Sequence, residues 1–256
     1  MIKDQLEKIG INNNDTLMIH SSLKALGIDG RDFIDELCAY LNDGLLIFPT
    51  HTWGIIKEDN QVFDVDGTPS NVGMLTNIAL NDRRFKRSLH PTHSVCAYGK
   101  NKDKYLACDL NAKTPVSPKG CFGVLKDLRA KILFIGAPLS KNTFVHSIEE
   151  AYNVPNRFTE HIYHFITKNG DEKLDYYMPR HFNKDCPHIS DNYEKLLPYM
   201  LKYGIAGEGT IGYAKSYLVD AFYCYKLVSH ILIRDIHAFD DQRDIAKYLN
   251  DFKKEE

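Results

Sequence analysis

Four short apolar runs, rich in β-branched and aromatic residues, recur along the first half of the chain. They are DTLMIHSSL (residues 15–23), GLLIFPT (44–50), HSVCAYG (93–99) and KILFIGA (131–137). Between them, RDFIDELCAYLN (31–42) and SNVGMLTNIALND (70–82) carry apolar residues at the spacing of one helix face. This alternation of strands and helices predicts an α/β layer fold.

The second half adds a hairpin and a helical C-terminal third. EHIYHFITKNGDEKLDYYMP (160–179) contains two strand-like runs around an Asn-Gly pair, which favours a two-residue β-turn. Helices are predicted over 190–204, over 214–233 and over the charged amphipathic tail 240–256. No internal repeat or low-complexity linker interrupts the sequence. We therefore expect a single domain over 1–256, with 157–185 as a hairpin-containing segment.

The composition is that of an ordinary globular protein, 43% hydrophobic and 26% charged, with a net charge of −2. Neither this charge nor any long Lys/Arg run provides the basic footprint of a nucleic-acid-binding protein. No apolar stretch is long enough to span a bilayer, and the N-terminal MIKDQLEKIGINNNDT lacks the apolar core of a signal peptide. We therefore expect a soluble cytoplasmic protein that binds neither nucleic acid nor membrane.

The six cysteines are scattered without a CxxC pair, so neither a structural zinc site nor a disulfide framework is indicated. Cys121 lies in the glycine-containing run KGCFGV, where a nucleophile is conceivable, but no base is adjacent in the sequence. A free cysteine is usually a small buried hydrophobic residue. We expect reduced thiols without a catalytic role.

Polar segments stand at the ends of the predicted strands, where the functional groups of α/β folds gather. They are HSSLKALG (20–27), PTHTWG (49–54), RSLHPTHS (87–94) and APLSKNTFVHSIEE (137–150). We interpret their side chains together, as parts of one candidate site.

The last segment places a histidine in the first turn of a helix with two acids behind it. Asn142 or Thr143 can cap this helix, and Glu149 and Glu150 follow His146 at spacings that bring either carboxylate to the imidazole. A carboxylate on one ring nitrogen fixes the tautomer and stabilises the imidazolium as it forms, which suits a general base. In the alternative, the acids only complement the helix dipole and the histidine is a surface group.

Three further histidines, His51, His90 and His93, offer a different hypothesis, in which they hold the divalent metal of a hydrolase. Against it, the spacing is not HExxH, a proline prevents a regular helix across the last two, and no nearby carboxylate completes the ligand set. Asp64 and Asp66 lack the full ligand series of a calcium loop. We therefore predict a site without a metal ion.

Several ordered motifs resemble the aminoglycoside 3-N-acetyltransferase family of acetyl-CoA-dependent enzymes. They are IHSSLKALG, LLIFPTHTWG, FDVDGTPSNVGML, RSLHPTHSVCAYG, SPKGCFGVL and KILFIGAPLSKNTFVHSIEEAY, and the resemblance continues loosely through GIAGEGTIGYAKSYLVDAF (204–222). The family pattern Asn-Thr-x-x-His-x-x-Glu falls on Asn142, Thr143, His146 and Glu149. The resemblance thus favours Glu149 over Glu150 as the partner of the histidine.

The resemblance implies an α/β fold with a central mixed sheet flanked by helices, and direct transfer of an acetyl group from acetyl-CoA to an amine without a metal. It implies catalytic roles for His146 and Glu149. By the same resemblance, Ser21, Ser22 and Leu23 lie along the pantetheine arm or phosphates of CoA, with Arg87, Ser88 and Ser117 nearby.

The predicted mechanism is a sequential transfer. His146 accepts the proton of the acceptor amine as the amine attacks the thioester, Glu149 stabilises the imidazolium, and backbone amides near Ser22 stabilise the oxyanion. A non-catalytic CoA-binding module is a rival hypothesis, which the presence of both His146 and Glu149 disfavours. The sequence is compatible with a homodimer.

The expected acceptor is a small amine that is less cationic than an aminoglycoside, such as an amino sugar or a nucleotide-linked amino sugar. A site for polycationic drugs would gather carboxylates. This chain is nearly neutral, and the hairpin-containing segment 157–185, which we expect on the acceptor side, carries no acidic run. Aminoglycoside resistance is the alternative, for which Asp64, Asp66 or Glu160 could build a local pocket for a cation.

Overall fold

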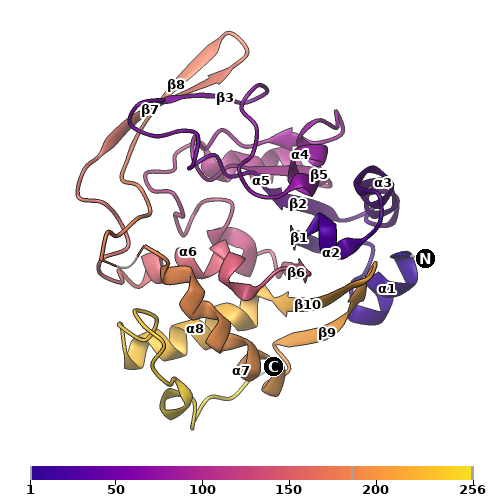
Figure 1. Cartoon of the computed structure of the whole chain (residues 1–256), viewed down its shortest axis with the longest axis vertical. Coiled ribbons are helices and arrows are strands. Elements are labelled where there is room, and N and C mark those ends of the chain that lie inside the picture. The colour runs from indigo at the N-terminus through magenta and orange to yellow at the C-terminus, as the bar shows by residue number, and fades with distance from the viewer. Residues whose placement is uncertain (1, 186, 255–256) are drawn as a thin grey trace.

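The computed structural model describes residues 2–185 and 187–254 (Figure 1). Within these residues, a seven-stranded sheet in the order β4-β5-β2-β1-β6-β10-β9 forms the centre. Its strands in chain order are β1 (Thr16–Ser21), β2 (Leu45–Pro49), β4 (Lys86–Arg87), β5 (Val95–Gly99), β6 (Lys131–Ile135), β9 (Ala206–Ile211) and β10 (Ala214–Asp220). Strand β1 pairs in parallel with β2 and β6, whereas β5 and β10 are antiparallel to their neighbours. The sheet is therefore mixed, as predicted.

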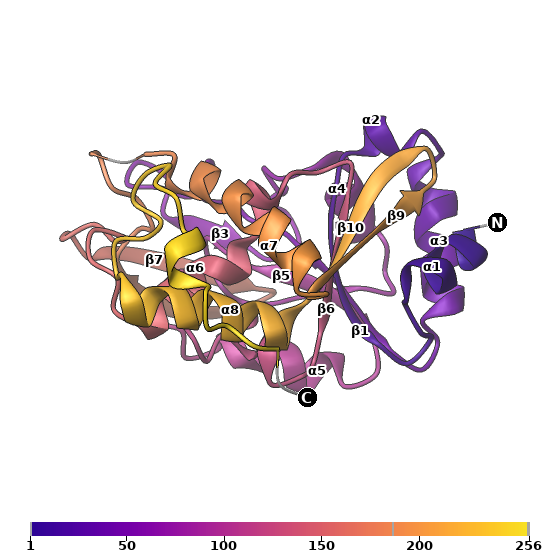
Figure 2. The ribbon, with the colours of Figure 1, turned by 90° about the horizontal axis from the view of Figure 1, so that it is seen from below.

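Helices cover both faces of this sheet, as Figure 2 shows. The α-helices are α1 (Ile2–Ile9), α2 (Leu23–Leu26), α3 (Gly30–Tyr40), α4 (Met74–Leu80), α5 (Lys102–Leu106), α6 (Thr143–Ala151), α7 (Leu197–Lys202) and α8 (Ala221–Arg234). The 3-10 helices are η1 (Ala107–Asp109), η2 (Gly123–Lys126), η3 (Leu139–Lys141), η4 (Ile189–Leu196) and η5 (Ala246–Tyr248). Among these helices, none combines the length and apolar content that crossing a bilayer requires.

The central strands are apolar on both sides because each side meets a helix layer. Met18 and Ile132 belong to the core beneath α6 and α8, whereas Leu17, Ile19 and Leu133 belong to the core beneath α1 and α3. The continuous apolar runs in the sequence are thus strands buried on two faces. The four predicted strands are confirmed as β1, β2, β5 and β6.

A second sheet, in the order β3-β7-β8, lies beside the first (upper left in Figure 1). Its strands are β3 (Val62–Asp64), β7 (Tyr163–Asn169) and β8 (Glu172–Met178), and β7 and β8 form the predicted hairpin. Gly170 has φ +60° at the turn, a conformation that glycine adopts without strain. A small separate core that includes Phe63, Phe165 and Met178 holds this sheet together.

The predicted helix over 214–233 is wrong in its first third. Residues Ala214–Asp220 form β10, which pairs with β6 and β9, and the helix begins only at Ala221. The side chain of Asp220 accepts a hydrogen bond from the amide of Tyr223 and so caps the helix there. Because strand β6 needs a hydrogen-bonding partner on this side, tertiary pairing overrides the helical pattern.

The predicted C-terminal helix is also wrong within the described residues, where 240–254 contain only the 3-10 turn Ala246–Tyr248; residues 255–256 lie outside the described part. The ammonium group of Lys195 donates to the carbonyls of Ala238, Asp241 and Arg243. These carbonyl groups are thereby held by a distant lysine. The apolar residues of the tail still pack into the core, but from an irregular chain.

Candidate active site

A cavity of about 510 Å³ opens at one edge of the seven-stranded sheet. The parallel strands β1, β2 and β6 bring their C-terminal ends to this edge, and antiparallel β5 brings its N-terminal end to it. The lining comes chiefly from segments 51–53, 92–93, 140–146, 180–182 and 187–191. Three of the four predicted strand-end segments therefore contribute, whereas residues 20–27 do not line the cavity itself.

Helix α6 places His146 at the cavity. Phe144, Val145 and Ile148 are buried and fix the helix against the core beneath α8. The predicted helix start is confirmed, but Asn142 at the cap position makes no side-chain capping bond. One face of the helix is thus committed to packing, and His146 turns toward the cavity.

His146, Glu149 and Tyr193 form a hydrogen-bonded group. Tyr193 donates its hydroxyl proton to Glu149 Oε2, and the same hydroxyl oxygen lies 2.6 Å from His146 Nδ1, which is 3.3 Å from Glu149 Oε2. Because a hydroxyl has a single proton, Nδ1 must be the donor toward these oxygens. Nε2 of a neutral His146 is then the nitrogen with a free lone pair, as a general base requires.

Glu149 is completely buried and is held as an anion by Arg157. Arg157 Nε lies 2.9 Å from Glu149 Oε1, and Arg157 Nη2 lies 2.8 Å from Asp240 Oδ1. Burial alone would raise the pKa of Glu149, but the hydrogen bond to His146 and the charge of Arg157 bring that pKa below its usual value. The carboxylate therefore stays charged beneath the imidazole.

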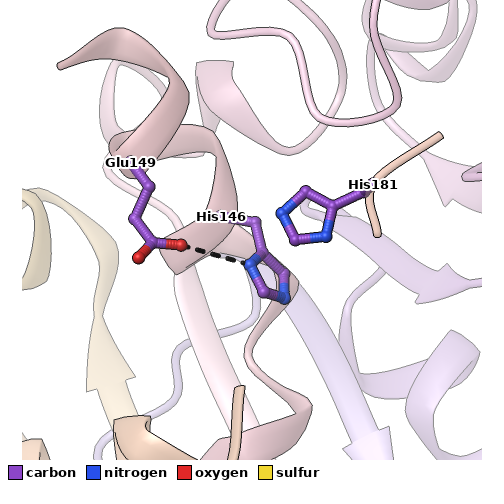
Figure 3. A group of neighbouring side chains, drawn as sticks. All are labelled: His146, Glu149 and His181. Carbon is purple, nitrogen blue, oxygen red and sulfur yellow. Dashed lines mark hydrogen bonds and ion pairs between the residues drawn. The ribbon is translucent and has the colours of Figure 1, made fainter. Parts of the chain in front are cut away.

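His181 covers the other side of His146. In Figure 3 the ring of His146 lies between the carboxylate of Glu149 and the ring of His181, and the two ring centroids are 4.0 Å apart. Burial lowers the pKa of His181 well below its ordinary value, and the charges of His146 and Arg157 act in the same direction. Nε2 of His181 has no hydrogen-bond partner among the described residues. A neutral imidazole thus borders the ring of His146.

A family model described as aminoglycoside 3-N-acetyltransferase matches residues 18–232. The chain belongs to this family. Among the curated members, aminoglycoside N(3)-acetyltransferase III of Salmonella sp is 26% identical over 255 residues, which cover 86% of each chain. The family expected from the ordered motifs is confirmed.

Two solved structures share the fold. AAC-IIIb in a binary complex with CoASH is 19% identical, with a TM-score of 0.78 over 91% of this chain and 95% of that one. A histidine-to-alanine variant of AAC(3)-IVa in complex with a gentamicin is 21% identical, with a TM-score of 0.76 over 93% and 89%. These similarities confirm the predicted mixed sheet with flanking helices.

Ser21, Ser22 and Leu23 lie beside the cavity lining and outside the cavity. Ser21 ends β1, and a Cβ atom on Gly73 would come within 3.7 Å of its carbonyl oxygen; the neighbouring Val72 lines the cavity. The Ser22 side chain caps α2, and its amide donates to a backbone carbonyl of β6. That amide is therefore not available for the predicted oxyanion.

The structure does not bring Arg87, Ser88 or Ser117 to the cavity. Arg87 donates to backbone and hydroxyl oxygens of four different residues, Thr50, Val65, Thr68 and Ser94. Ser88 is buried and donates to Asp109 Oδ2 at 2.6 Å. Ser117 stabilises its own turn by accepting from the Lys119 amide. The polar groups of Arg87 and Ser88 connect parts of the fold, and their contact with CoA stays a prediction.

The hypothesis of a metal held by His51, His90 and His93 does not fit the geometry. Nδ1 of His90 accepts from the backbone amides of Thr92 and His93, and Nε2 lies 3.1 Å from the Thr114 carbonyl. Both nitrogens of His90 are thus committed to backbone groups. These three histidines therefore cannot act together as ligands without breaking buried hydrogen bonds.

In the described part of the chain, the one group with ligand spacing for a metal is His146, Glu149 and His181. Both carboxylate oxygens of Glu149 are already bonded, one to Arg157 and the other to Tyr193 and His146. A cation placed there would face the guanidinium of Arg157. The geometry of the group is that of an imidazole bound to a buried carboxylate.

Proposed function

We propose that this chain transfers the acetyl group of acetyl-CoA to the amine of an amino sugar. The observation that carries the proposal is the pair His146 and Glu149, whose imidazole lines the cavity of a chain in this acetyltransferase family. A curated relative is named an aminoglycoside N(3)-acetyltransferase, and a structural neighbour is a complex with CoASH. Aminoglycosides are themselves built from amino sugars.

His146 acts as the general base in this proposal. Its Nε2 takes a proton from the acceptor amine as the amine nitrogen attacks the thioester carbonyl carbon. The C–N bond forms, the C–S bond breaks, and the departing CoA thiolate receives the proton from the imidazolium. Glu149 stabilises the imidazolium in between, because Arg157 keeps the carboxylate charged.

An aromatic wall of the cavity suits a sugar ring. Trp53 lines the cavity and is 45% exposed, and Phe182 lies on the same lining. Small-molecule sites combine such aromatic surfaces with a few placed polar groups, here the imidazoles of His146 and His181.

An acceptor screen tests the proposal. The purified protein is incubated with acetyl-CoA and a panel of amino sugars and aminoglycosides, and release of free thiol is compared with the gain of one acetyl group in the acceptor mass. Both signals should appear together for at least one amine and depend on His146. Thiol release with no acetylated product, or no turnover with any amine, would contradict the proposed activity.

Replacement of Tyr193 by phenylalanine should lower kcat about tenfold with little change in the KM of the acceptor. The ring still packs against Phe239, but the hydroxyl that holds Glu149 and His146 is lost, and a hydrogen bond to a charged group contributes on this scale. Steady-state kinetics separate the two parameters. An unchanged kcat together with a lower melting temperature would show that the hydroxyl is only structural.

CoA should raise the melting temperature of the protein by mass action, and Ser22→Trp should reduce that rise. In this proposal the pantetheine arm leaves the cavity past Val72 and reaches the segment Ser21–Leu23. Ser117→Trp is the matched comparison, since Ser117 is half-buried and outside the cavity lining, like Ser22, but bonds within its own turn and not beside Val72. The shift between free and CoA-saturated protein is measured for each variant; a shift lost in Ser117→Trp and kept in Ser22→Trp would reverse the assignment.

A further inference from the structure

The charged groups around the cavity are unusual for a site that takes a polycation. Lys141, Arg180 and Asp191 line it, so cationic side chains outnumber carboxylates among the described lining residues. A site for a polycation is expected to present the opposite balance, because the summed field of carboxylates concentrates and orients positive ligands.

Three imidazoles of the lining, those of His51, His93 and His181, do not alter this balance. Burial lowers the pKa of His51 to about 3, and neighbouring imidazoles act in the same direction. Burial likewise holds the pKa values of His93 and His181 well below the ordinary value. These three rings are neutral at physiological pH, so they add no positive charge to the balance of Lys141, Arg180 and Asp191.

Arg180 and Lys141 have no carboxylate partner among residues 2–185 and 187–254. Arg180 donates one bond from Nη2 to the Trp53 carbonyl at 3.2 Å, which fixes the guanidinium at the cavity wall and leaves other N–H groups for a ligand. Arg180 also directly precedes His181, whose ring packs on His146. The guanidinium of Arg180, which has no carboxylate partner among the described residues, therefore lies on the segment that packs against His146.

The acids that the sequence offered for a cation pocket lie elsewhere. Asp64, Asp66 and Glu160 do not line the cavity. Asp64 Oδ1 instead accepts from the amides of Asp66 and Gly67 and stabilises its own turn. These three carboxylates therefore do not form, at this cavity, a pocket for the ammonium groups of an aminoglycoside.

We propose, on the basis of the acetyltransferase function above, that the acceptor is an amino sugar bearing an anionic group, a carboxylate or a phosphate, which Arg180 and Lys141 bind while the amine meets His146. A guanidinium binds both kinds of anion through paired N–H donors. The anion also orients the sugar, so that one amine among several polar groups reaches the base.

Matched acceptors test the proposal directly. The specificity constants of glucosamine, glucosamine 6-phosphate, 2-amino-2-deoxyglucuronic acid and kanamycin are compared at low salt and at high salt. One of the anionic sugars should exceed glucosamine by about tenfold, which is the value of one charge-assisted contact, and the preference should fall as salt rises. Comparison of the specificity constants of glucosamine 6-phosphate and 2-amino-2-deoxyglucuronic acid shows whether a phosphate or a carboxylate is bound.

Two variants and a control locate the effect. Arg180→Gln and Lys141→Gln should each lower kcat/KM for the preferred anionic sugar about tenfold, mainly through KM, with a much smaller loss for glucosamine. Lys173→Gln removes an exposed lysine of the hairpin, outside the cavity. It should leave the specificity constants of all four acceptors unchanged.

The outcomes separate this inference from the function on which it rests. If kanamycin has the highest specificity constant, or if neutral and anionic sugars are equal, the anionic acceptor is overturned and the acetyltransferase activity stands. If no amine yields free thiol and acetylated product, the acetyltransferase activity fails and the acceptor class fails with it.

Discussion

Replacement of His146 by alanine is expected to lower kcat by about 10²- to 10⁴-fold while acetyl-CoA still binds. His146 Nδ1 is bound to Glu149 and Tyr193, so Nε2 is the nitrogen left to accept the amine proton. Alanine removes that acceptor, and the proposed CoA segment lies on a different strand end. Thiol release at saturating acceptor measures the loss, and the melting-temperature shift with CoA measures binding.

His164→Ala is the matched control for this variant. His164 is a half-exposed histidine of β7, bound to Asp175 at 2.6 Å and absent from the cavity lining, so its loss should leave kcat unchanged. A folded His146→Ala protein that turns over at a near-native rate would remove His146 from the role of base.

The parts of the fold that could be predicted are those in which local pattern and tertiary demand agree. Residues 132–137 form a continuous apolar run, and β6 is buried on both faces at the centre of the sheet. Residues 214–220 carry a pattern that serves a helix or a strand, and only the neighbouring strands β6 and β9 decide between them. The residues of this segment alone do not show which strands will lie beside it.

The same division applies to the site. His146 and Glu149 are three residues apart on one helix, so their contact follows from helix geometry. Tyr193 is 47 residues from His146, and Arg157 reaches Glu149 from beyond the end of the helix. Sequence spacing predicts neither contact. Tyr193 reaches His146, and Arg157 reaches Glu149, only because η4 and the 152–157 turn pack against α6.

Polar residues near strand ends are easily over-assigned to ligands. Ser88 stands in a segment that does contribute to the cavity, yet its hydroxyl bonds to Asp109 and accepts from the Val95 amide. A buried polar group must find partners within the fold or in a ligand, and the sequence alone does not distinguish the two. The chemistry of a segment therefore predicts the site better than the role of each residue in it.

Replacement of Arg157 by methionine is expected to lower the free energy of unfolding by about 3–5 kcal/mol at neutral pH, because it leaves the buried Glu149 carboxylate without its counter-charge. Urea unfolding followed by circular dichroism measures the loss. Arg234→Met, which breaks an exposed pair with Asp251, is the control and should have a much smaller effect. Adding Glu149→Gln to Arg157→Met should recover part of the loss, since it removes the stranded charge.

The pH dependence of unfolding should identify the Glu149 carboxylate as the source of the stability lost in Arg157→Met. In the parent protein the pKa of Glu149 is lowered, so its contribution to stability is present above the unfolded pKa of about 4.3 and is lost as the pH falls through the folded pKa. Without Arg157, burial raises that pKa, the folded state takes up a proton, and the variant gains stability as the pH falls. The gap in unfolding free energy between parent and Arg157→Met should therefore narrow on acidification. A gap that stays constant from neutral pH to the acid range would assign the loss to packing or to the bond with Asp240, and not to the stranded carboxylate.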